Sequence, residues 1–237
     1  MEDGKKKRVV VFDPHPDDAD WWTGGLTLLM KNEGCKIDYV CAGPTEEETR
    51  QFALESARIL GVERHFFEIP LLHSPELTGR LSDAVSRLFA ALNPNIVIIP
   101  PRTDYHQEHV ILSRLLFEFL HWSHRLGFYD IEVYEYDSVE NRNPIEVLID
   151  ISSVWKQHME SLRCHKNFLR LGIPESTLVY TKTGRAMILG ATFYPDGPVR
   201  YAEGYNILQG NHRTISSLPS LLGDRFAYRS QEGLLEM

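Results

Sequence analysis

The sequence predicts an α/β protein with a Rossmann-like, mostly parallel β-sheet and helices on both faces of the sheet. Short apolar runs rich in β-branched residues, such as Arg8–Phe12 and Asn95–Ile99, are typical of strands buried on both faces. Segments with helical spacing of apolar residues alternate with these runs, which favours parallel strands joined by helices. The chain has 237 residues, 43% of them hydrophobic, which is enough for the core of one layered domain.

Four strand–helix units are expected in the first half of the chain. The first helix has Leu26 and Leu29 at helical spacing, and Gly34 ends it. Thr45, with Glu48 three residues later, matches a capping box at the start of the second helix. The expected strands are Arg8–Phe12, Lys36–Ala42, His65–Ile69 and Asn95–Ile99, and the expected helices are about Asp17–Asn32, Thr45–Gly61, Leu77–Leu92 and Glu108–Leu120.

The pattern changes beyond Gly127. Two further strands are expected at Ile131–Tyr136 and Ile145–Ile149, followed by a helix from Ser153 to about Leu171. The segment Leu178–Leu189 fits either a helix or a strand. Because no linker rich in Gly, Ser or Pro divides the chain, we expect one domain over residues 1–237, with a Rossmann-like core in 1–127 and a part in 128–237 that completes the site.

Charge and cysteine content narrow the class of protein. The formal net charge is −8, and no stripe of Lys and Arg runs along the chain, so neither nucleic acid nor a membrane surface is expected as a partner. No apolar stretch approaches the roughly 20 residues of a membrane span, and the first residues lack the apolar segment of a signal peptide. Three cysteines without a C-x-x-C pair favour a reducing cytoplasm.

Two polar segments are expected at the same edge of the sheet. His15–Asp18 directly follows the first strand, and Asp104–His109 follows the fourth. Loops that leave the carboxyl ends of parallel strands gather at one edge, where α/β proteins bind their ligands. Each segment taken alone is also compatible with a plain turn, helix capping or surface polarity, but their joint position favours a functional site.

Spacing assigns a role to each side chain of these segments. His15 and Asp18 are three residues apart across a turn that Pro16 fixes, and His109 closes the set from the other loop. Catalytic zinc is typically held by three protein ligands, such as two imidazoles and one carboxylate, and its fourth position is left for water. The ion acidifies this water and polarises a substrate carbonyl. Asp17 is left free to act as general base on that water.

The remaining candidates serve catalysis or substrate binding. His106 can donate a proton, and we expect Glu108 to orient the His106 imidazole. Arg50 and Arg102 can bind substrate hydroxyls or a phosphate, or can simply be solvated. Trp21 can stack on a sugar ring, with core packing or a subunit contact as the alternative.

These motifs resemble those of the PIG-L/LmbE-like N-acetylglucosaminyl deacetylases, a group that includes bacillithiol- and mycothiol-pathway deacetylases and diacetylchitobiose deacetylase. The first motif is Pro14–Asp20 followed by Gly24 and Gly25, with Asp20 in place of the usual Glu. The second motif is met by Pro101, Asp104, His106, Glu108 and His109, with Glu108 in place of the usual Asp. Further similar elements are Ala57–Val62, Asp150–Ser152 with Lys156, and Tyr201–Glu203.

The resemblance implies an activity and a cofactor. It implies zinc-dependent removal of an N-acetyl group from an N-acetylglucosamine-type sugar or glycoconjugate, with His15, Asp18 and His109 as ligands, Asp17 as base and His106 as acid or oxyanion donor. Fe²⁺, Mn²⁺ or Co²⁺ suit the same ligands. Relatives that form trimers or hexamers suggest a homo-oligomer. The alternatives are a metal-dependent hydrolase of another small amide and a non-catalytic nucleotide- or sugar-binding α/β module, although the chain lacks G-x-G-x-x-G after its first strand.

Overall fold

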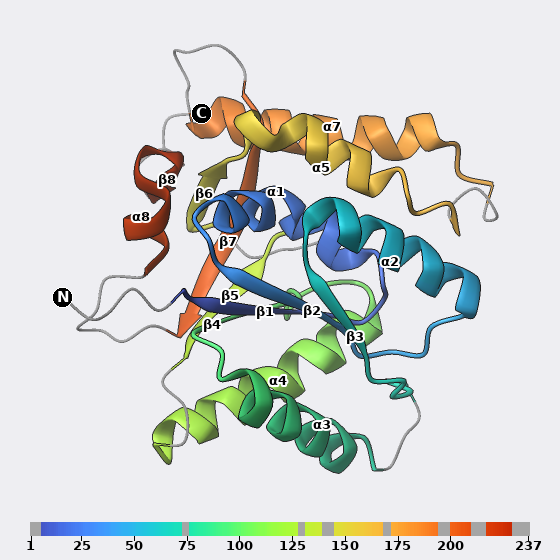
Figure 1. Cartoon of the computed structure of the whole chain (residues 1–237), viewed down its shortest axis with the longest axis vertical. Helices are drawn as coiled ribbons and strands as arrows, with labels where there is room; N and C mark the ends of the chain where they lie inside the picture. The colour runs from blue at the N-terminus through green and yellow to red at the C-terminus, as the bar shows by residue number, and fades with distance from the viewer. Residues whose placement is uncertain are drawn as a thin grey trace.

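A computed structural model describes residues 6–72, 76–127, 131–138, 145–167, 172–193, 200–209 and 217–228. The described strands form one eight-stranded sheet in the order β3-β2-β1-β4-β5-β7-β6-β8 (Figure 1). The strands are β1 (Arg8–Asp13), β2 (Lys36–Cys41), β3 (Glu63–Phe66), β4 (Ile96–Ile99), β5 (Glu132–Tyr136), β6 (Val147–Asp150), β7 (Ala202–Gln209) and β8 (Phe226–Tyr228). The helices are α1 (Asp18–Asn32), α2 (Glu47–Leu60), α3 (Leu77–Leu92), α4 (Gln107–Arg125), α5 (Trp155–Leu162), α7 (Glu175–Phe193) and α8 (Ser217–Leu222).

The sheet is parallel at one end and antiparallel at the other. β3, β2, β1, β4 and β5 pair in parallel, whereas β7 and β6 pair antiparallel with their neighbours. Helices α3 and α4 cover one face, and α1, α2, α5 and α7 lie on the other (Figure 1). The predicted α/β class, with a mostly parallel sheet and helices on both faces, is therefore confirmed.

The apolar run of β1 explains why this strand lies at the centre of the sheet. Val9 and Val11 pack into the core beneath α1, while Val10 and Phe12 pack into the core beneath α3 and α4. All four side chains are fully buried. A strand buried on both faces needs apolar residues at every position, which is the pattern that the sequence shows.

Two predicted boundaries in the first half of the chain are wrong, each for a local reason. The third strand ends at Phe66 rather than Ile69 because Glu68 adopts a left-handed backbone, with φ of 53°, that takes the chain out of the extended conformation. Helix α2 begins after Glu46, so Thr45 is not its cap; the Thr45 hydroxyl instead donates to the Gly43 carbonyl at 3.4 Å.

The chain after residue 145 differs most from expectation. Ser153 lies within the 3₁₀ turn Ser152–Val154 instead of capping a helix. Helix α5 follows this turn and ends at Leu162. The predicted helix end near Leu171 lies outside the described residues. Leu178–Leu189 belongs to a helix, α7. Strand β7, which was not predicted, inserts between β5 and β6.

Strand β7 also ties the later part of the chain to α1. The Glu203 carboxylate accepts hydrogen bonds from the backbone N–H groups of Gly25 (3.0 Å) and Leu26 (2.9 Å), in the middle of α1. Tyr205 donates its hydroxyl to the same carboxylate at 2.8 Å. Helix α1, which follows the first polar motif, is therefore fixed by hydrogen bonds to a strand from the last part of the chain.

Within the described part of the chain, no helix combines the length and the apolar character that crossing a membrane requires.

Candidate metal centre and active site

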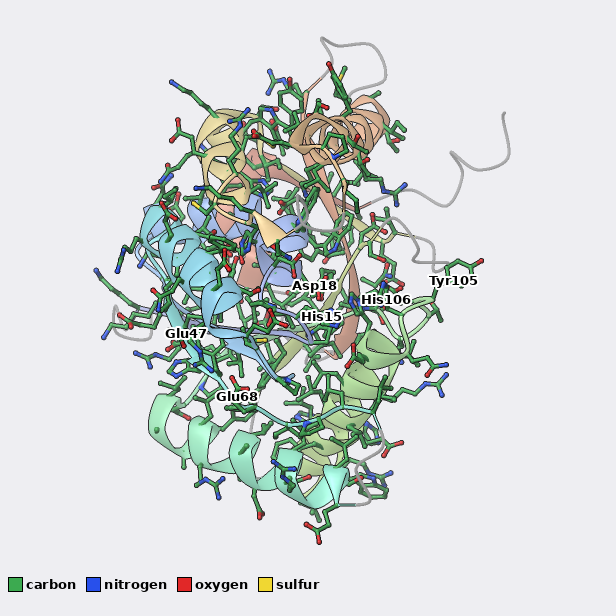
Figure 2. All side chains as sticks on the ribbon, turned by 90° about the vertical axis from the view of Figure 1, so that its right-hand side faces the viewer. His15, Asp18, Glu47, Glu68, Tyr105 and His106 are labelled. Carbon is green, nitrogen blue, oxygen red and sulfur yellow. The ribbon has the colours of Figure 1, made fainter. Side chains whose placement is uncertain are left out.

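The two polar motifs meet because their strands are neighbours. β1 and β4 pair in parallel, with Val9 opposite Ile96 and Val11 opposite Ile98, so the loops after their carboxyl ends leave the sheet at the same edge. The first loop leads into α1 and the second into α4. Figure 2 shows His15, Asp18 and His106 side by side at this edge, while Tyr105 points outward.

His15, Asp18 and His109 form a compact donor cluster. One oxygen of Asp18, Oδ2, lies 3.0 Å from His15 Nδ1 and 3.2 Å from His109 Nε2. One ligand atom from each of the three residues lies within 4.8 Å of the others. The three side chains that spacing selected as ligands are therefore close enough to bind one cation.

A second layer of carboxylates holds the two imidazoles. The other nitrogen of His15, Nε2, lies 2.7 Å from Glu108 Oε2. The other nitrogen of His109, Nδ1, lies 3.3 Å from Asp104 Oδ2, within ion-pair distance but without the alignment of a hydrogen bond. Each imidazole thus faces Asp18 with one nitrogen and an outer carboxylate with the other, an arrangement typical of zinc-binding histidines.

This geometry corrects one prediction about Glu108. The sequence suggested that Glu108 orients His106, but the structure pairs its carboxylate with His15. The reason is that α4 begins at Gln107, so Glu108 projects from the first turn of the helix toward the opposite loop, while His106 occupies the N-cap position outside the helix. Glu108 therefore supports a ligand rather than the candidate acid.

The cluster has strongly perturbed protonation equilibria. Burial opposes a charge on the histidines, but Asp18 and the outer carboxylates outweigh it and raise the pKa of His15 to about 9 and that of His109 to about 10. The pKa of Asp18 is lowered because the attraction of both imidazoles exceeds the effect of its burial. Burial also acts on Asp104, yet His109 and the His106 backbone N–H lower its pKa to about 2.

Asp17 and His106 flank this cluster. Asp17 is the N-cap residue of α1 and is only 8% exposed. Its burial, and then the negative charge of Asp18, raise the pKa of its carboxyl group. The His106 ring lies 5.9 Å from the His15 ring and 5.2 Å from the His109 ring, centroid to centroid. Both predicted proton-transfer groups therefore lie beside the donor cluster.

A cavity of about 570 Å³ opens over the cluster. The catalytic and metal candidates Asp17, Asp18 and His106 form part of its wall, and Trp21 lies in the same wall. Its other described lining residues are His15, Pro16, Trp22, Thr49, Asp104, His109, Ser138, Asn167, Ile173 and Thr181. This volume lies in the range of small-molecule sites.

Several of these lining residues were not singled out from the sequence. Ser138 follows the carboxyl end of β5, the next parallel strand, and this position in the sequence is one from which its approach to the site could be predicted. Its hydroxyl donates to Asp104 at 2.9 Å. Thr49, Asn167 and Thr181 come from segments whose approach to the site depends on helix packing, and no local pattern indicates it.

The three predicted substrate contacts have different environments. Arg50 forms an ion pair with Glu68, and its guanidinium lies 4.2 Å from the Phe66 ring centroid, outside the described cavity lining. Figure 2 shows Glu68 well away from His15. Arg102 pairs with Glu135 at 3.2 Å and lines a separate depression. Of the three predicted substrate contacts, only Trp21 lines the cavity. Substrate binding by Arg50 and Arg102 stays a prediction that their positions do not support.

The residues present fit a divalent metal ion. Two imidazole nitrogens and a carboxylate oxygen converge from the loop after β1 and the first turns of α1 and α4, and a carboxylate lies beside the outer nitrogen of each histidine. This mixed nitrogen and oxygen set suits zinc and other first-row divalent metals better than Ca²⁺ or Mg²⁺, which prefer oxygen ligands alone.

Comparison with known proteins agrees with the motifs. The family model for PIG-L, described as GlcNAc-PI de-N-acetylase, matches residues 10–120, a span that contains both motifs. The predicted resemblance to the PIG-L family is confirmed. A search of curated proteins finds no match.

Solved structures share the fold across most of the chain. The hydratase GalB from Pseudomonas putida KT2440, which acts on 4-carboxy-2-hydroxymuconate, is 20% identical, with a TM-score of 0.71 over 88% of this chain and 99% of that one. N,N′-diacetylchitobiose deacetylase from Pyrococcus horikoshii is 22% identical, with a TM-score of 0.67 over 91% and 88%. The zinc-inhibited form of teicoplanin deacetylase Orf2 is 12% identical, with a TM-score of 0.64 over 86% and 100%. Because a hydratase and deacetylases share this fold, the reaction must be argued from the site.

Proposed function

We propose that this protein is a metal-dependent N-deacetylase that hydrolyses the N-acetyl group of an N-acetylglucosamine-type sugar or glycoconjugate. The observation that carries the proposal is the convergence of His15, Asp18 and His109 below a cavity that Asp17 also lines. The PIG-L family match and the structural similarity to a diacetylchitobiose deacetylase support the substrate class. Zinc is the proposed ion, and Fe²⁺, Mn²⁺ or Co²⁺ suit the same ligands.

Each side chain has a defined task in amide hydrolysis. When bound, the divalent ion supplies an electrophile for the acetyl carbonyl and acidifies a coordinated water. The Asp17 carboxylate accepts a proton from the attacking water. A ring nitrogen of His106 donates to the carbonyl oxygen as charge develops there, or gives a proton to the leaving amine. The C–N bond then breaks, leaving acetate and the free amino sugar.

Glu108 and Asp104 act through the ligands. Glu108 hydrogen-bonds the outer nitrogen of His15, and Asp104 lies 3.3 Å from the outer nitrogen of His109, so both favour the ring orientation in which the other nitrogen faces Asp18. Asp104 additionally accepts from the His106 backbone N–H at 3.0 Å, which links the candidate acid to the ligand shell. These contacts support the rings of His15 and His109 and the backbone of His106.

Acetate release tests the proposal. The purified protein, loaded with zinc, is incubated with N-acetylglucosamine, diacetylchitobiose, N-acetylglucosaminides with apolar aglycones and simple N-acetyl amines. We expect acetate from at least one amino sugar, and loss of release in Asp17→Asn and His15→Ala. The matched controls are Asp83→Asn and His121→Ala, which change exposed residues on the outer helices α3 and α4.

The alternatives give different results in the same assay. Release from simple amides alone indicates a hydrolase of another small amide. Binding of a nucleotide or sugar without turnover, in a protein that takes up no metal, indicates a non-catalytic module. Unchanged turnover in both Asp17→Asn and His15→Ala would contradict the assigned roles.

A further inference from the structure

We propose that Arg64 is a positioning residue for the candidate active site. Its buried guanidinium clamps the segment Asp13–Asp20, which carries His15, Asp17 and Asp18. The catalytic consequence of this inference rests on the proposed function, whereas the clamp itself can be measured without it.

Arg64 lies in an unusual place for a charged side chain. It belongs to β3, the strand at the parallel end of the sheet, where it pairs in register with Tyr39 of β2. The side chain has no exposed surface. Its guanidinium lies 5.1 Å from the Tyr39 ring centroid. A charge buried this deeply is costly unless it is paired, so its partners indicate what it does.

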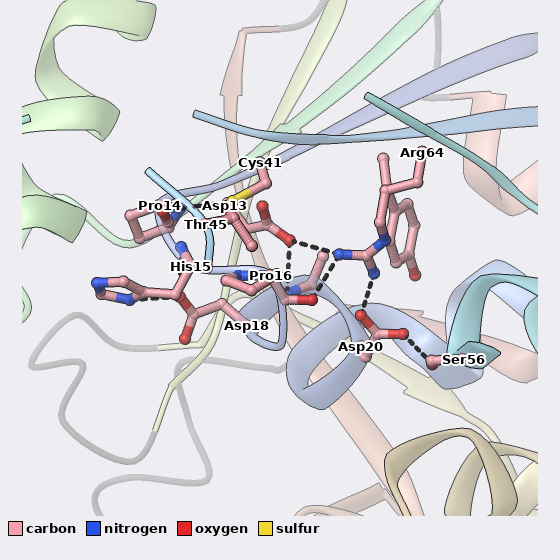
Figure 3. A network of polar contacts seen from close by, with 12 residues as sticks. Asp13, Pro14, His15, Pro16, Asp18, Asp20, Cys41, Thr45, Ser56 and Arg64 are labelled. Atoms are coloured by element: carbon pink, nitrogen blue, oxygen red, sulfur yellow. Dashed lines mark hydrogen bonds and ion pairs between the residues drawn. The ribbon is translucent and has the colours of Figure 1, made fainter. Parts of the chain in front are cut away.

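The guanidinium contacts the first motif at three points (Figure 3). At the start of the segment, one terminal nitrogen lies 3.6 Å from the Asp13 carboxylate. In the middle, the same nitrogen donates to the Pro16 carbonyl at 2.5 Å. At the end, the other terminal nitrogen forms an ion pair with Asp20. One planar group therefore fixes both ends and the centre of the loop.

These contacts act on the groups that do the chemistry. The Pro16 carbonyl belongs to the peptide unit that leads into Asp17, so holding this oxygen fixes the backbone from which the candidate base projects. Asp13 also accepts from the Ala19 backbone N–H at 3.4 Å, in the first turn of α1. Movement of the guanidinium would thus shift the candidate base and its neighbouring ligands together.

A second residue completes the clamp. Ser56 of α2 donates its hydroxyl to the second oxygen of Asp20, so both oxygens of this carboxylate have partners. The contacts use both terminal nitrogens of the planar guanidinium, whereas lysine would offer a single nitrogen.

Two variants separate positioning from stability. Arg64→Lys keeps the charge but loses the fork. Arg64→Met combined with Asp20→Asn removes the clamp without leaving the Asp20 charge buried and unpaired. Arg80→Lys and Arg80→Met, at an exposed position on α3, are the matched controls.

The readouts are steady-state kinetics, the absorption spectrum of the Co²⁺-loaded protein, and hydrogen exchange of the backbone over residues 13–20. We expect both Arg64 variants to fold, kcat to fall by about 100-fold with KM within about threefold, the cobalt bands to shift, and exchange in residues 13–20 to accelerate. The Arg80 controls should match the wild type in every readout.

Several outcomes would overturn the proposal. A folded Arg64 variant with kcat within about threefold of the wild type and wild-type exchange in residues 13–20 would show that the clamp positions nothing. Failure of both variants to fold would show that Arg64 serves folding alone. If the wild type releases no acetate from any substrate, it is the proposed function that is wrong. Hydrogen exchange over residues 13–20 then tests the Arg64 clamp without any measurement of activity.

Discussion

The fold resists protonation of His158, and we therefore expect mild acid to destabilise the protein. The side chain is fully buried in α5, and its Nε2 donates to the Asp20 carbonyl at 2.8 Å. Its Nδ1 lies 3.5 Å from the Glu203 carboxylate. Burial, and then the positive charge of Lys182, lower the pKa of His158 from 6.5 to about 4, although Glu203 partly opposes them.

The size of the effect follows from this difference in pKa. In the unfolded chain His158 binds a proton as the pH falls through about 6.5, whereas the folded protein binds it only near pH 4. The neutral imidazole thus contributes its full stability above pH 6.5, and that contribution is lost as the pH falls toward 4. At about 1.4 kcal/mol for each pKa unit, the free energy of unfolding falls by about 3 kcal/mol over this window.

Urea unfolding of the wild type and of His158→Gln tests this reasoning. A glutamine amide can keep the hydrogen bond to Asp20 without titrating. Between pH 7.5 and 4.5 we expect the wild type to lose about 2.5 kcal/mol more stability than the variant. His121→Gln, at an exposed position of α4, should behave as the wild type. Equal losses in the wild type and His158→Gln would refute the assignment of the acid sensitivity to this residue.

Further tests concern the candidate base, the packing of α1 against Ile151 and the metal ion. Asp17→Asn should lower kcat about 100- to 1,000-fold with little change in KM, because it removes the general base; initial rates of acetate release measure this. Gly25→Ala should cost about 1–3 kcal/mol of stability, since a Cβ atom would lie 2.6 Å from Ile151 Cγ2. Gly79→Ala, where the structure leaves open space, should instead gain about 0.5–1 kcal/mol, and urea unfolding compares the two. Removal of metal by a chelator should abolish activity, and added Zn²⁺ should restore it and raise the melting temperature by mass action; full activity after exhaustive chelation would contradict a metal role.

The sequence could predict what depends on local pattern. The continuous apolar run of β1 identified a strand buried on both faces, and α3 spans Leu77–Leu92 as expected. Two polar motifs placed after parallel strands were enough to predict that His15 and His109 approach each other. In these cases the structure is determined by residues within one element or by the pairing of adjacent strands.

What the sequence could not predict depends on side chains that find distant partners. Arg64 lies on a short strand and resembles any polar residue of a sheet edge, yet it is buried against the first motif. Glu108 faces His15 rather than His106 because the start of α4 directs it there. The insertion of β7 between β5 and β6 is a matter of sheet topology that no local spacing records.

We infer that two distant loops hold one divalent cation beside Asp17. Anomalous scattering at the zinc edge, from crystals grown with Zn²⁺, would locate this ion. We predict a single strong peak within about 2.0–2.2 Å of nitrogens of His15 and His109 and an oxygen of Asp18. A peak at another position, or no peak at this cluster in a fully active protein, would show that these three residues do not hold the metal.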